Sequence, residues 1–480
     1  MVTLKFSGSG YFNVNNQDEN YHGNLYLNKE HGGIMLTIDI FHDGAPLSYL
    51  AFPLEIEYIS GELTNGFKLT LLNCKRTKTE SYYGSRDTFT YIAEFMLEGI
   101  KVNQLKDNQF TQVDFMVPDV IVWGDKSSYK IDEENYGLSE DFDSKRIEIF
   151  SNSKYSIEYD IQGSMLPVNE GSLLIEEIKL IQKPMIIVTA KNPQRFDYFI
   201  ERYKLIKRYI EIAMKKEISL SEMRSYPSKV ILENNGFSYE TSVNINSYLI
   251  KERKENSIQS YNSHTYLFSL NEIKKYGDFN EYIQNTEKLE PIIDLYLDLI
   301  YSKDISAVRA FLNVTQALET YHSRFKYGGN IKGFVKRIDE VILKKRPYSA
   351  RKEDRKFLMA KSKKFVTLES RLAELLLAEF NIRFYTGKIK YIDFPNTIAV
   401  TRNYYTHYDE KLKSRIIKKN ELASYVRILT AILEYYILEE LGFKDSEFRR
   451  SKVAESLRDI QVGFDVKDAA QKQQEESENK

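Results

Sequence analysis

The hydrophobic periodicity of this 480-residue chain changes near residue 279, and no other feature of the sequence constrains its fold as strongly. Before this point, short and partly alternating apolar runs, such as 34–40 and 67–72, are separated by Gly or Asn, which is typical of antiparallel β-strands. After it, apolar residues recur at helical spacing. We therefore expect an α+β protein, in which an N-terminal antiparallel β region (sandwich- or barrel-like) is followed by an all-α helical bundle.

The chain is too long for one ordinary core, and its patterns divide it into four parts. They predict a β-rich domain at 1–125, a mixed β/α region at 126–275, a helical domain at 279–463 and a disordered polar tail at 464–480. The patterns leave open whether the middle region is a separate domain. Within it, Asn192-Pro193 predicts the start of a helix, because Pro is favoured at the first helical position.

Helical spacing in the C-terminal part predicts helices at 279–301, 306–327, 331–345, 368–384, 396–408 and 420–441. Gly328-Gly329 and Gly442 stand where glycine commonly ends a helix. Trp123, the one tryptophan of the chain, lies near the end of the β region. We interpret it as a core residue, with stacking on a ligand as the alternative.

Composition narrows the possible partners and cofactors. The net charge is −1, so any attraction to nucleic acid must be local. The single cysteine, Cys74, cannot form an internal disulfide or a cysteine-based zinc site. The chain has no apolar run of about 20 residues and no signal-peptide core at its N-terminus, so we expect a cytoplasmic protein without a membrane partner. No metal-ligand spacing accompanies the site below, so we expect neither metal nor cofactor.

Residues 401–409, TRNYYTHYD, are the strongest candidate for chemistry. On a helix, Arg402 and His407 lie about 140° apart around the axis, whereas Asn403 and His407, four residues apart, are neighbours. Asn403 is therefore placed to orient the imidazole while Arg402 reaches in from the flank. In the alternative arrangement, Arg402 of one subunit and His407 of another grip the same phosphate across a two-fold axis.

These residue types suit cleavage of RNA, whose 2′-OH is its own nucleophile. The unperturbed pKa of histidine permits either proton role near neutrality, and arginine binds phosphate oxygens through a bidentate fork. The spacing alone is also compatible with a simpler interpretation, in which Arg402 is a surface arginine and His407 a hydrogen-bonded histidine.

The segment around this motif resembles the R-x4-6-H helix of HEPN domains, preceded by an amphipathic segment at 372–384 and followed by a long helix at 421–441. Residues 311–322, FLNVTQALETYH, resemble the first helix of the ApeA-like branch, including its acidic residue, here Glu319. The glycine-punctuated strands, the run at 67–73 and Trp123 are similar to the N-terminal domain of the same ApeA anti-phage proteins.

The resemblance implies an activity and an assembly. HEPN ribonucleases are typically dimers that cut RNA without metal at a composite Arg/His site. Carried over, Arg402 and His407 would be catalytic, and Asn403 would be the polar residue that often follows the arginine. Glu319 would support the site by tuning Arg402 or His407, or it would form a structural ion pair with Arg324 or a neighbouring helix. His322, three residues later, is interpreted as structural.

Two further groups are candidates for RNA binding. Tyr405, with its neighbours Tyr404 and Tyr408, is predicted either to stack an unpaired base or to pack between helices. A basic stretch at 332–364 is predicted to bind the phosphate backbone, with a solvated helix face as the alternative. Its candidate residues are Lys344, Lys345, Arg346, Arg351, Lys352, Arg355 and Lys356.

Two functions are consistent with the sequence. In the first, the chain is an anti-phage effector that assembles as a homodimer or higher homo-oligomer and cuts single-stranded RNA, with tRNA loops as the expected substrate. Its N-terminal β region would restrain the nuclease or respond to a trigger, such as a phage-encoded protein. In the second, the chain is a non-enzymatic scaffold that binds nucleotide, RNA or protein and carries a β-type ligand-binding module.

Overall fold

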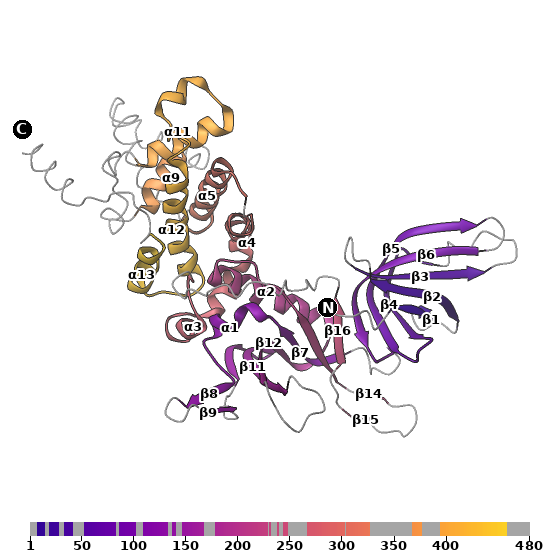
Figure 1. The fold of residues 1–480 in the computed structure, drawn as a ribbon. Coiled ribbons are helices and arrows are strands. Elements are labelled where there is room, and N and C mark those ends of the chain that lie inside the picture. Colours follow the sequence, from indigo (N-terminus) through magenta and orange to yellow (C-terminus); the bar gives the residue numbers. More distant parts are fainter. Residues whose placement is uncertain are drawn as a thin grey trace, which may run out of the picture. The chain divides into compact units, whose positions relative to one another are not determined.

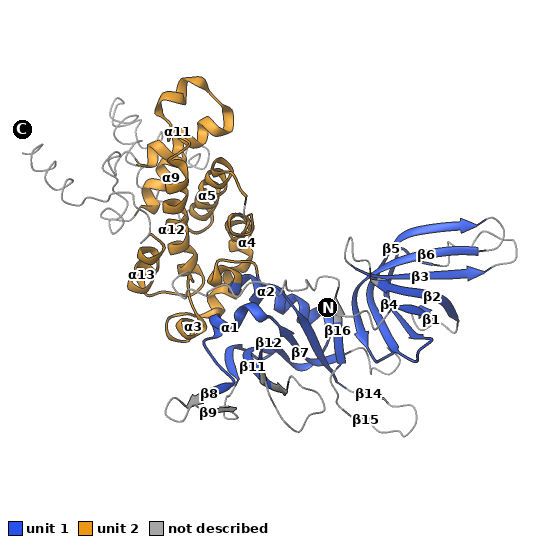
Figure 2. Ribbon diagram, viewed as in Figure 1, with its two compact units in different colours: residues 1–210, 218–263 blue, residues 211–217, 264–480 orange. Residues whose placement is uncertain are grey.

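The chain forms two compact units (Figure 2), which comprise Met1–Ile210 with Ile218–Ser263, and Glu211–Glu217 with His264–Lys480. The computed structural model describes residues 7–14, 19–27, 33–41, 52–82, 86–101, 109–132, 137–140, 146–167, 178–228, 230–231, 238–239, 243–247, 266–302, 304–326, 367–376 and 394–457. The predicted fold class is confirmed, since unit 1 is an antiparallel β structure and the described part of unit 2 is helical (Figure 1).

A closed antiparallel barrel forms the first part of unit 1 (Figure 1). Its strands are β1 (Gly8–Val14), β2 (Asn20–Leu27), β3 (Ile34–Phe41), β4 (Glu55–Leu63), β5 (Lys68–Tyr82) and β6 (Arg86–Glu98). They pair in the order β6-β3-β2-β1-β4-β5, and β5 pairs back to β6, which closes the barrel. Fully buried Phe12 packs in its core, and a Cβ at Gly61 on neighbouring β4 would lie 2.3 Å from the Phe12 ring. Only glycine therefore fits at position 61.

Strand β6 connects the barrel to a second group of strands. Its first part pairs with β3, and Phe95–Leu97 pairs with β16 instead. From there the sheet continues as β16-β13-β7-β12-β11-β10. These strands are β7 (Gln109–Met116), β10 (Ile147–Ser151), β11 (Tyr155–Pro167), β12 (Ile178–Arg195), β13 (Glu222–Pro227) and β16 (Val243–Ser247). Two small hairpins accompany them: β8 (Tyr129–Asp132) with β9 (Gly137–Glu140), and β14 (Val230–Ile231) with β15 (Ser238–Tyr239).

In unit 1, one local prediction is confirmed and another is wrong. Trp123 is fully buried, as predicted for a core residue, and its segment forms η4 (Pro118–Val120) and the one-turn helix α1 (Ile121–Gly124). Helix α2 (Phe196–Met214) starts after Asn192-Pro193, which belong to the end of β12. The pairing of β12 with β7 shifts register between Thr189 and Gln194, so Pro193 lies in an irregularity where its missing N–H breaks no ladder. Phe115 stacks on Tyr203 at 4.2 Å between ring centroids, which fixes α2 on the sheet.

Helix α12 (Leu422–Glu440) packs against α5 (Ala307–Tyr321), α13 (Ser446–Ser456) and α4 (Phe279–Tyr301), and its buried residues lie on all its sides. The other described helical elements of unit 2 are α3 (Leu270–Tyr276), the π-turn η6 (His322–Lys326), α9 (Leu368–Leu375), α11 (Phe394–His407) and the 3-10 turn η10 (Glu410–Arg415). Helix α4 matches its predicted range. Helices α3 and α13 were not predicted, because each is short and its start depends on a cap, Ser269 for α3 and Asp445 for α13.

Gly442 ends α12 with φ +97°, which confirms the predicted cap. A Cβ at this position would lie 2.3 Å from the carbonyl oxygen of Asp278, so the close approach of the two segments also requires glycine. Other predictions fall outside the described residues: the cap at Gly328-Gly329, the helix at 331–345, the second half of 368–384 and the tail at 464–480.

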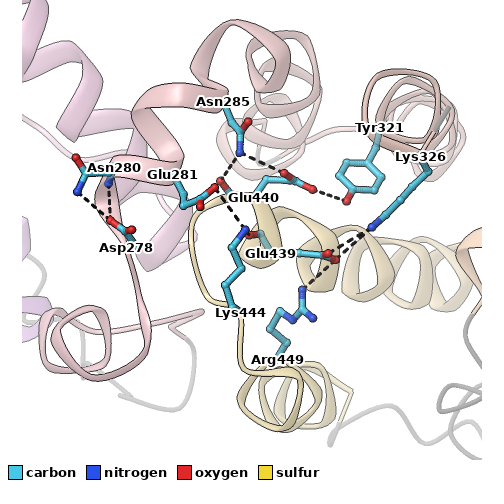
Figure 3. A network of polar contacts seen from close by, with 10 residues as sticks. All are labelled: Asp278, Asn280, Glu281, Asn285, Tyr321, Lys326, Glu439, Glu440, Lys444 and Arg449. Atoms are coloured by element: carbon cyan, nitrogen blue, oxygen red, sulfur yellow. Dashed lines mark hydrogen bonds and ion pairs between the residues drawn. The ribbon is translucent and has the colours of Figure 1, made fainter. Parts of the chain in front are cut away.

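A network of polar contacts binds the C-terminal end of α12 to α4, α5, η6 and α13 (Figure 3). We call its core the α12 network: Asn285, Tyr321, Lys326, Glu439, Glu440 and Arg449. Each of its four carboxylate oxygens has a partner. Glu440 accepts from Tyr321 at 2.9 Å and from Asn285 at 3.2 Å. Glu439 contacts Lys326 at 3.4 Å and Arg449 at 3.0 Å.

Candidate active site

Helix α11 carries the R-x4-H motif, and its buried face determines where each motif residue points. Phe394, Ile398 and Thr401 face the core. Relative to Ile398, Arg402 lies about 40° around the axis and His407 about 180°. Arg402 therefore stands at the edge of the packed face, while His407, the last residue of the helix, lies on the solvent side and is exposed.

The guanidinium of Arg402 is held by a carboxylate from α5. Its Nη2 donates to Oε2 of Glu319 at 3.2 Å, and its Nη1 donates to Oδ1 of Asn403 at 3.3 Å. Both charged side chains are about one-third exposed, 33% for Arg402 and 31% for Glu319. Arg324, the other partner considered for Glu319, instead donates to the backbone oxygens of Glu287 and Lys288. Arg402 is thus oriented by the protein and still open to an anion.

Behind Arg402 lies a chain of polar contacts that we call the site network: Arg402, Glu319, Arg371, His322 and Glu374. Nε of Arg371 lies 3.9 Å from Oε1 of Glu319, and its Nη1 lies 3.3 Å from Nδ1 of His322. Nε2 of His322 lies 2.8 Å from Oε2 of Glu374. Since a guanidinium can only donate, Nδ1 of His322 accepts and Nε2 carries the proton that it donates to Glu374.

His322 is therefore a neutral, fully buried histidine. Burial lowers its pKa from the ordinary 6.5; Arg371 acts in the same direction, and Glu374 opposes it. This environment supports the structural interpretation of His322.

The end of α11 presents an aromatic group. The rings of Tyr404 and Tyr405 meet edge to face at 5.2 Å, and those of Tyr404 and Tyr408 at 5.8 Å. Tyr405 is partly buried, which raises its pKa, whereas Tyr408 is 64% exposed. Tyr408 also has φ +52°, a left-handed conformation uncommon for a tyrosine, and this ends the helix directly after His407. No hydrogen bond or ion pair among the described residues joins His407 to Arg402 or Asn403.

A basic loop follows the motif and is attached to α11. Ile417 donates its backbone N–H to the buried hydroxyl of Thr401 at 3.1 Å, and Arg415 donates to Asn396 at 3.4 Å. Residues 409–420 contain two acidic and five basic side chains. The exposed cations are Lys411, Lys413, Arg415, Lys418 and Lys419. The predicted RNA-binding residues Lys344, Lys345, Arg346, Arg351, Lys352, Arg355 and Lys356 lie outside the described residues.

Arg371 and the loop lysines are not among the site residues that the sequence predicted. Arg371 stands among Leu368, Leu372 and Leu375, so a charge on the apolar face of a predicted helix was the available signal. Among the residues that the structure describes, no group of three or more His, Cys, Asp or Glu side chains could hold a metal ion. None of the described helices is long and apolar enough to cross a membrane.

Two family models match the chain. Residues 8–285 match ApeA N-terminal domain 1, and residues 312–447 match the Apea-like HEPN domain. Comparison with curated proteins gave no match, and comparison with solved structures gave none either. The second match contains the motif helix α11 as well as Glu319 and Arg371, so the site network lies in a HEPN domain, the class of domain that indicates a ribonuclease. The chain belongs to the ApeA family, and its two domains are those of an ApeA-type defence protein.

Proposed function

We propose that this chain is a metal-independent endoribonuclease of anti-phage defence that cuts single-stranded RNA, with tRNA loops as the expected substrate. The observation that carries the proposal is the state of α11 within the HEPN match: Arg402 is oriented by Glu319 but one-third exposed, and exposed His407 lies on the same helix. An arginine that is held yet accessible can receive a phosphate at little cost in ordering.

The chemistry needs only these groups and the RNA itself. A base removes the 2′-OH proton, the bond from O2′ to phosphorus forms, and the bond from phosphorus to O5′ breaks. An acid then protonates the leaving O5′, which yields a 2′,3′-cyclic phosphate and a 5′-OH end. His407 is the candidate for a proton role, and Arg402 stabilises the charge on the phosphorane.

The positions of the two residues favour a site shared between two copies of the chain. On one α11 they are separated by about 140° of rotation and about 7.5 Å of rise, so they face different directions. A two-fold axis beside α11 would bring Arg402 of one copy toward the partner's His407. We therefore include a homodimer, or a higher oligomer built on it, in the proposal.

The basic loop after α11 supports RNA as the partner. The side chains of Lys411, Lys418 and Lys419 have no ion-pair partner within the described ranges, and Tyr408 offers an exposed ring beside them. Free cations next to an exposed aromatic ring are the combination that binds phosphates and stacks an unpaired base. We assign this loop the role of holding the strand beside α11.

Regulation is part of the proposal. An unrestrained ribonuclease would be toxic to the cytoplasm in which we expect it, and more than half of the chain lies outside the HEPN match. We propose that the ApeA N-terminal domain restrains the nuclease and releases it in response to infection, with a phage-encoded protein as the trigger.

The test uses the full chain, single-stranded RNA and bulk tRNA in the presence of EDTA, with and without extract of phage-infected cells to supply the trigger, and RNA ends are mapped after incubation. We expect cleavage that leaves 2′,3′-cyclic phosphate and 5′-OH ends, and its loss in Arg402→Ala and His407→Ala. Cleavage by both variants at the rate of the unchanged chain would contradict the site assignment. RNA binding without cleavage, with or without phage challenge, would favour the non-enzymatic scaffold.

A further inference from the structure

The carboxylate of Glu319 lies between two guanidinium groups, and each oxygen faces a different one. Oε2 accepts from Arg402 at 3.2 Å, whereas Oε1 lies 3.9 Å from Nε of Arg371. Arg402 comes from α11 and Arg371 from α9, so α5 presents one anion to both neighbouring helices. Because both oxygens belong to one rigid carboxylate, a change in the contact with one arginine also changes the contact with the other.

Arg371 is fixed from behind. Its side chain is almost fully buried, at 8% exposure for the residue, and its Nη1 is held by Nδ1 of His322. His322 is in turn anchored by Glu374. Nε of Arg371 has no hydrogen-bond partner among the described residues, and neither does Oε1 of Glu374. The Nε–H that faces Glu319 is thus uncommitted. Nε and Nη1 of buried Arg449 likewise have no hydrogen-bond partner among the described residues, but both oxygens of its partner Glu439 are engaged.

We propose that Arg371 is a positioning residue for Arg402 that acts through Glu319; this inference rests on the proposed ribonuclease function. Arg371 supplies the second positive charge that Glu319 needs, so the carboxylate does not bind Arg402 with both oxygens. Arg402 stays oriented but releasable. When an RNA phosphate takes Arg402, Glu319 moves toward the free Nε–H of Arg371 and keeps a partner. His322 and Glu374 hold Arg371 in place for this exchange.

Loss of Arg371 leaves Glu319 with one counter-ion. Glu319 then binds Arg402 through both oxygens and competes with the RNA phosphate. Because Arg402 acts on the charge of the transition state, we expect the effect in kcat, while KM, which depends on contacts along the RNA strand, changes little. A misplacement of a catalytic group by about 1 Å lowers the rate by up to about 100-fold.

The experiment is a double-mutant cycle on RNA cleavage by the full chain, with the variants Arg371→Gln, Glu319→Gln and both together. We expect Arg371→Gln to lower kcat about 10- to 100-fold, with KM within about three-fold of the unchanged chain and no corresponding loss of Tm. In the Glu319→Gln background, Arg371→Gln should lower kcat no further, because Arg371 acts only through this carboxylate. Arg449, equally buried at 7%, gives the matched control: Arg449→Gln should lower Tm and leave kcat unchanged.

A purely structural role for Arg371 predicts another pattern: the two losses would multiply, and kcat would follow Tm. Either that pattern or an unchanged kcat in Arg371→Gln overturns the inference. If Arg371→Gln does not fold, Arg371→Lys serves in the same cycle. Lysine keeps the charge but lacks the planar guanidinium whose separate N–H groups reach His322 and Glu319. Cleavage that requires Arg402 but not Arg371 would overturn this inference alone. Absence of cleavage by the unchanged chain, also when extract of phage-infected cells supplies the trigger, would overturn the proposed function and the inference with it.

Discussion

Unit 2 contains two polar networks, each built around carboxylates of a central helical bundle, and they differ in how completely those carboxylates are engaged. In the α12 network all four oxygens of Glu439 and Glu440 have partners, and the contacts join five elements (Figure 3). In the site network, Glu319 has one hydrogen-bonded oxygen, and Oε1 of Glu374 has no hydrogen-bond partner in the described part of the chain.

The difference separates stability from function. A network whose carboxylate oxygens are all engaged loses free energy of folding when one partner is removed, because the group left behind keeps no partner. A network whose carboxylates keep a free oxygen can exchange partners, which a site must do when substrate arrives. We therefore expect changes in the α12 network to lower stability and changes in the site network to lower activity.

The largest effect is expected at the two motif residues of α11, Arg402 and His407. Arg402→Ala and His407→Ala should each lower the rate of RNA cleavage by about 10²- to 10⁴-fold, the range for loss of a charge-stabilising or proton-transferring group. Both side chains are at least partly exposed, so Tm should hardly change. Cleavage rates and thermal melting of the same preparations measure both quantities. A large fall in Tm would place Arg402 among the structural contacts instead.

A smaller effect is expected from the basic loop. The double variant Lys411→Ala with Lys418→Ala should bind a single-stranded RNA, made non-cleavable by 2′-O-methylation, roughly three- to ten-fold more weakly. The slope of log K against log salt concentration should become shallower by about 0.7 for each lysine that contacts a phosphate. Fluorescence anisotropy at several salt concentrations gives both values. The pair Lys274→Ala with Lys288→Ala, exposed on α3 and α4, is the matched control. Equal losses in the two pairs would mean that the loop has no specific role.

The α12 network offers the matched test of stability. Tyr321→Phe removes one hydroxyl, which donates to Glu440 at 2.9 Å from a fully buried ring. We expect a loss of about 1–2 kcal/mol, or a few degrees in Tm, with the cleavage rate of the folded protein unchanged. A loss of activity larger than the loss of folded protein would show that the two networks are not independent.

The smallest effect is a pH dependence of Tm that comes from buried His322 in the site network. The folded-state pKa of His322 lies below the ordinary 6.5, so the unfolded chain binds the proton more readily. The stability that His322 contributes is therefore present above pH 6.5 and is lost as the pH falls below it. Between pH 7.5 and 5.5, Tm should fall more for the unchanged chain than for His322→Gln. Equal falls would mean that His322 is not the neutral group that its burial and its contact with Arg371 require.

Periodicity was sufficient for the fold class and for several helices, because core-facing residues repeat with the geometry of the element; α4 and α11 follow directly from it. Local sequence patterns gave wrong predictions where tertiary structure overrides them. Asn192-Pro193 has the pattern of a helix start, yet it continues β12, because the sheet tolerates Pro at a register shift. Closure of the barrel depends on the pairings of β1 with β4 and of β3 with β6, which join strands that are not consecutive in the chain and which no local pattern contains.

The candidate site likewise has features that follow from the local sequence and others that depend on tertiary packing. The helical position of Arg402 and its 140° separation from His407 could be worked out from the motif, since they need only the pitch of a helix. The contact of Arg402 with Glu319 joins residues 83 positions apart, and the place of Arg371 behind it depends on how α9 packs on α5. Distances of that kind come from tertiary packing. The interpretation of Asn403 as the partner of His407 remains a prediction, since Asn403 accepts from Arg402 here.

The most direct test of the account mixes two inactive proteins. Arg402→Ala and His407→Ala are purified separately, unfolded and refolded together, and assayed for RNA cleavage. If Arg402 of one copy works with the partner's His407, half of the dimers are mixed and each mixed dimer has one intact site of two, so activity returns to about a quarter of that of the unchanged chain. No recovery would contradict a site that pairs one arginine with one partner histidine. Full cleavage by either variant alone would contradict the assignment of the R-x4-H motif as the catalytic element.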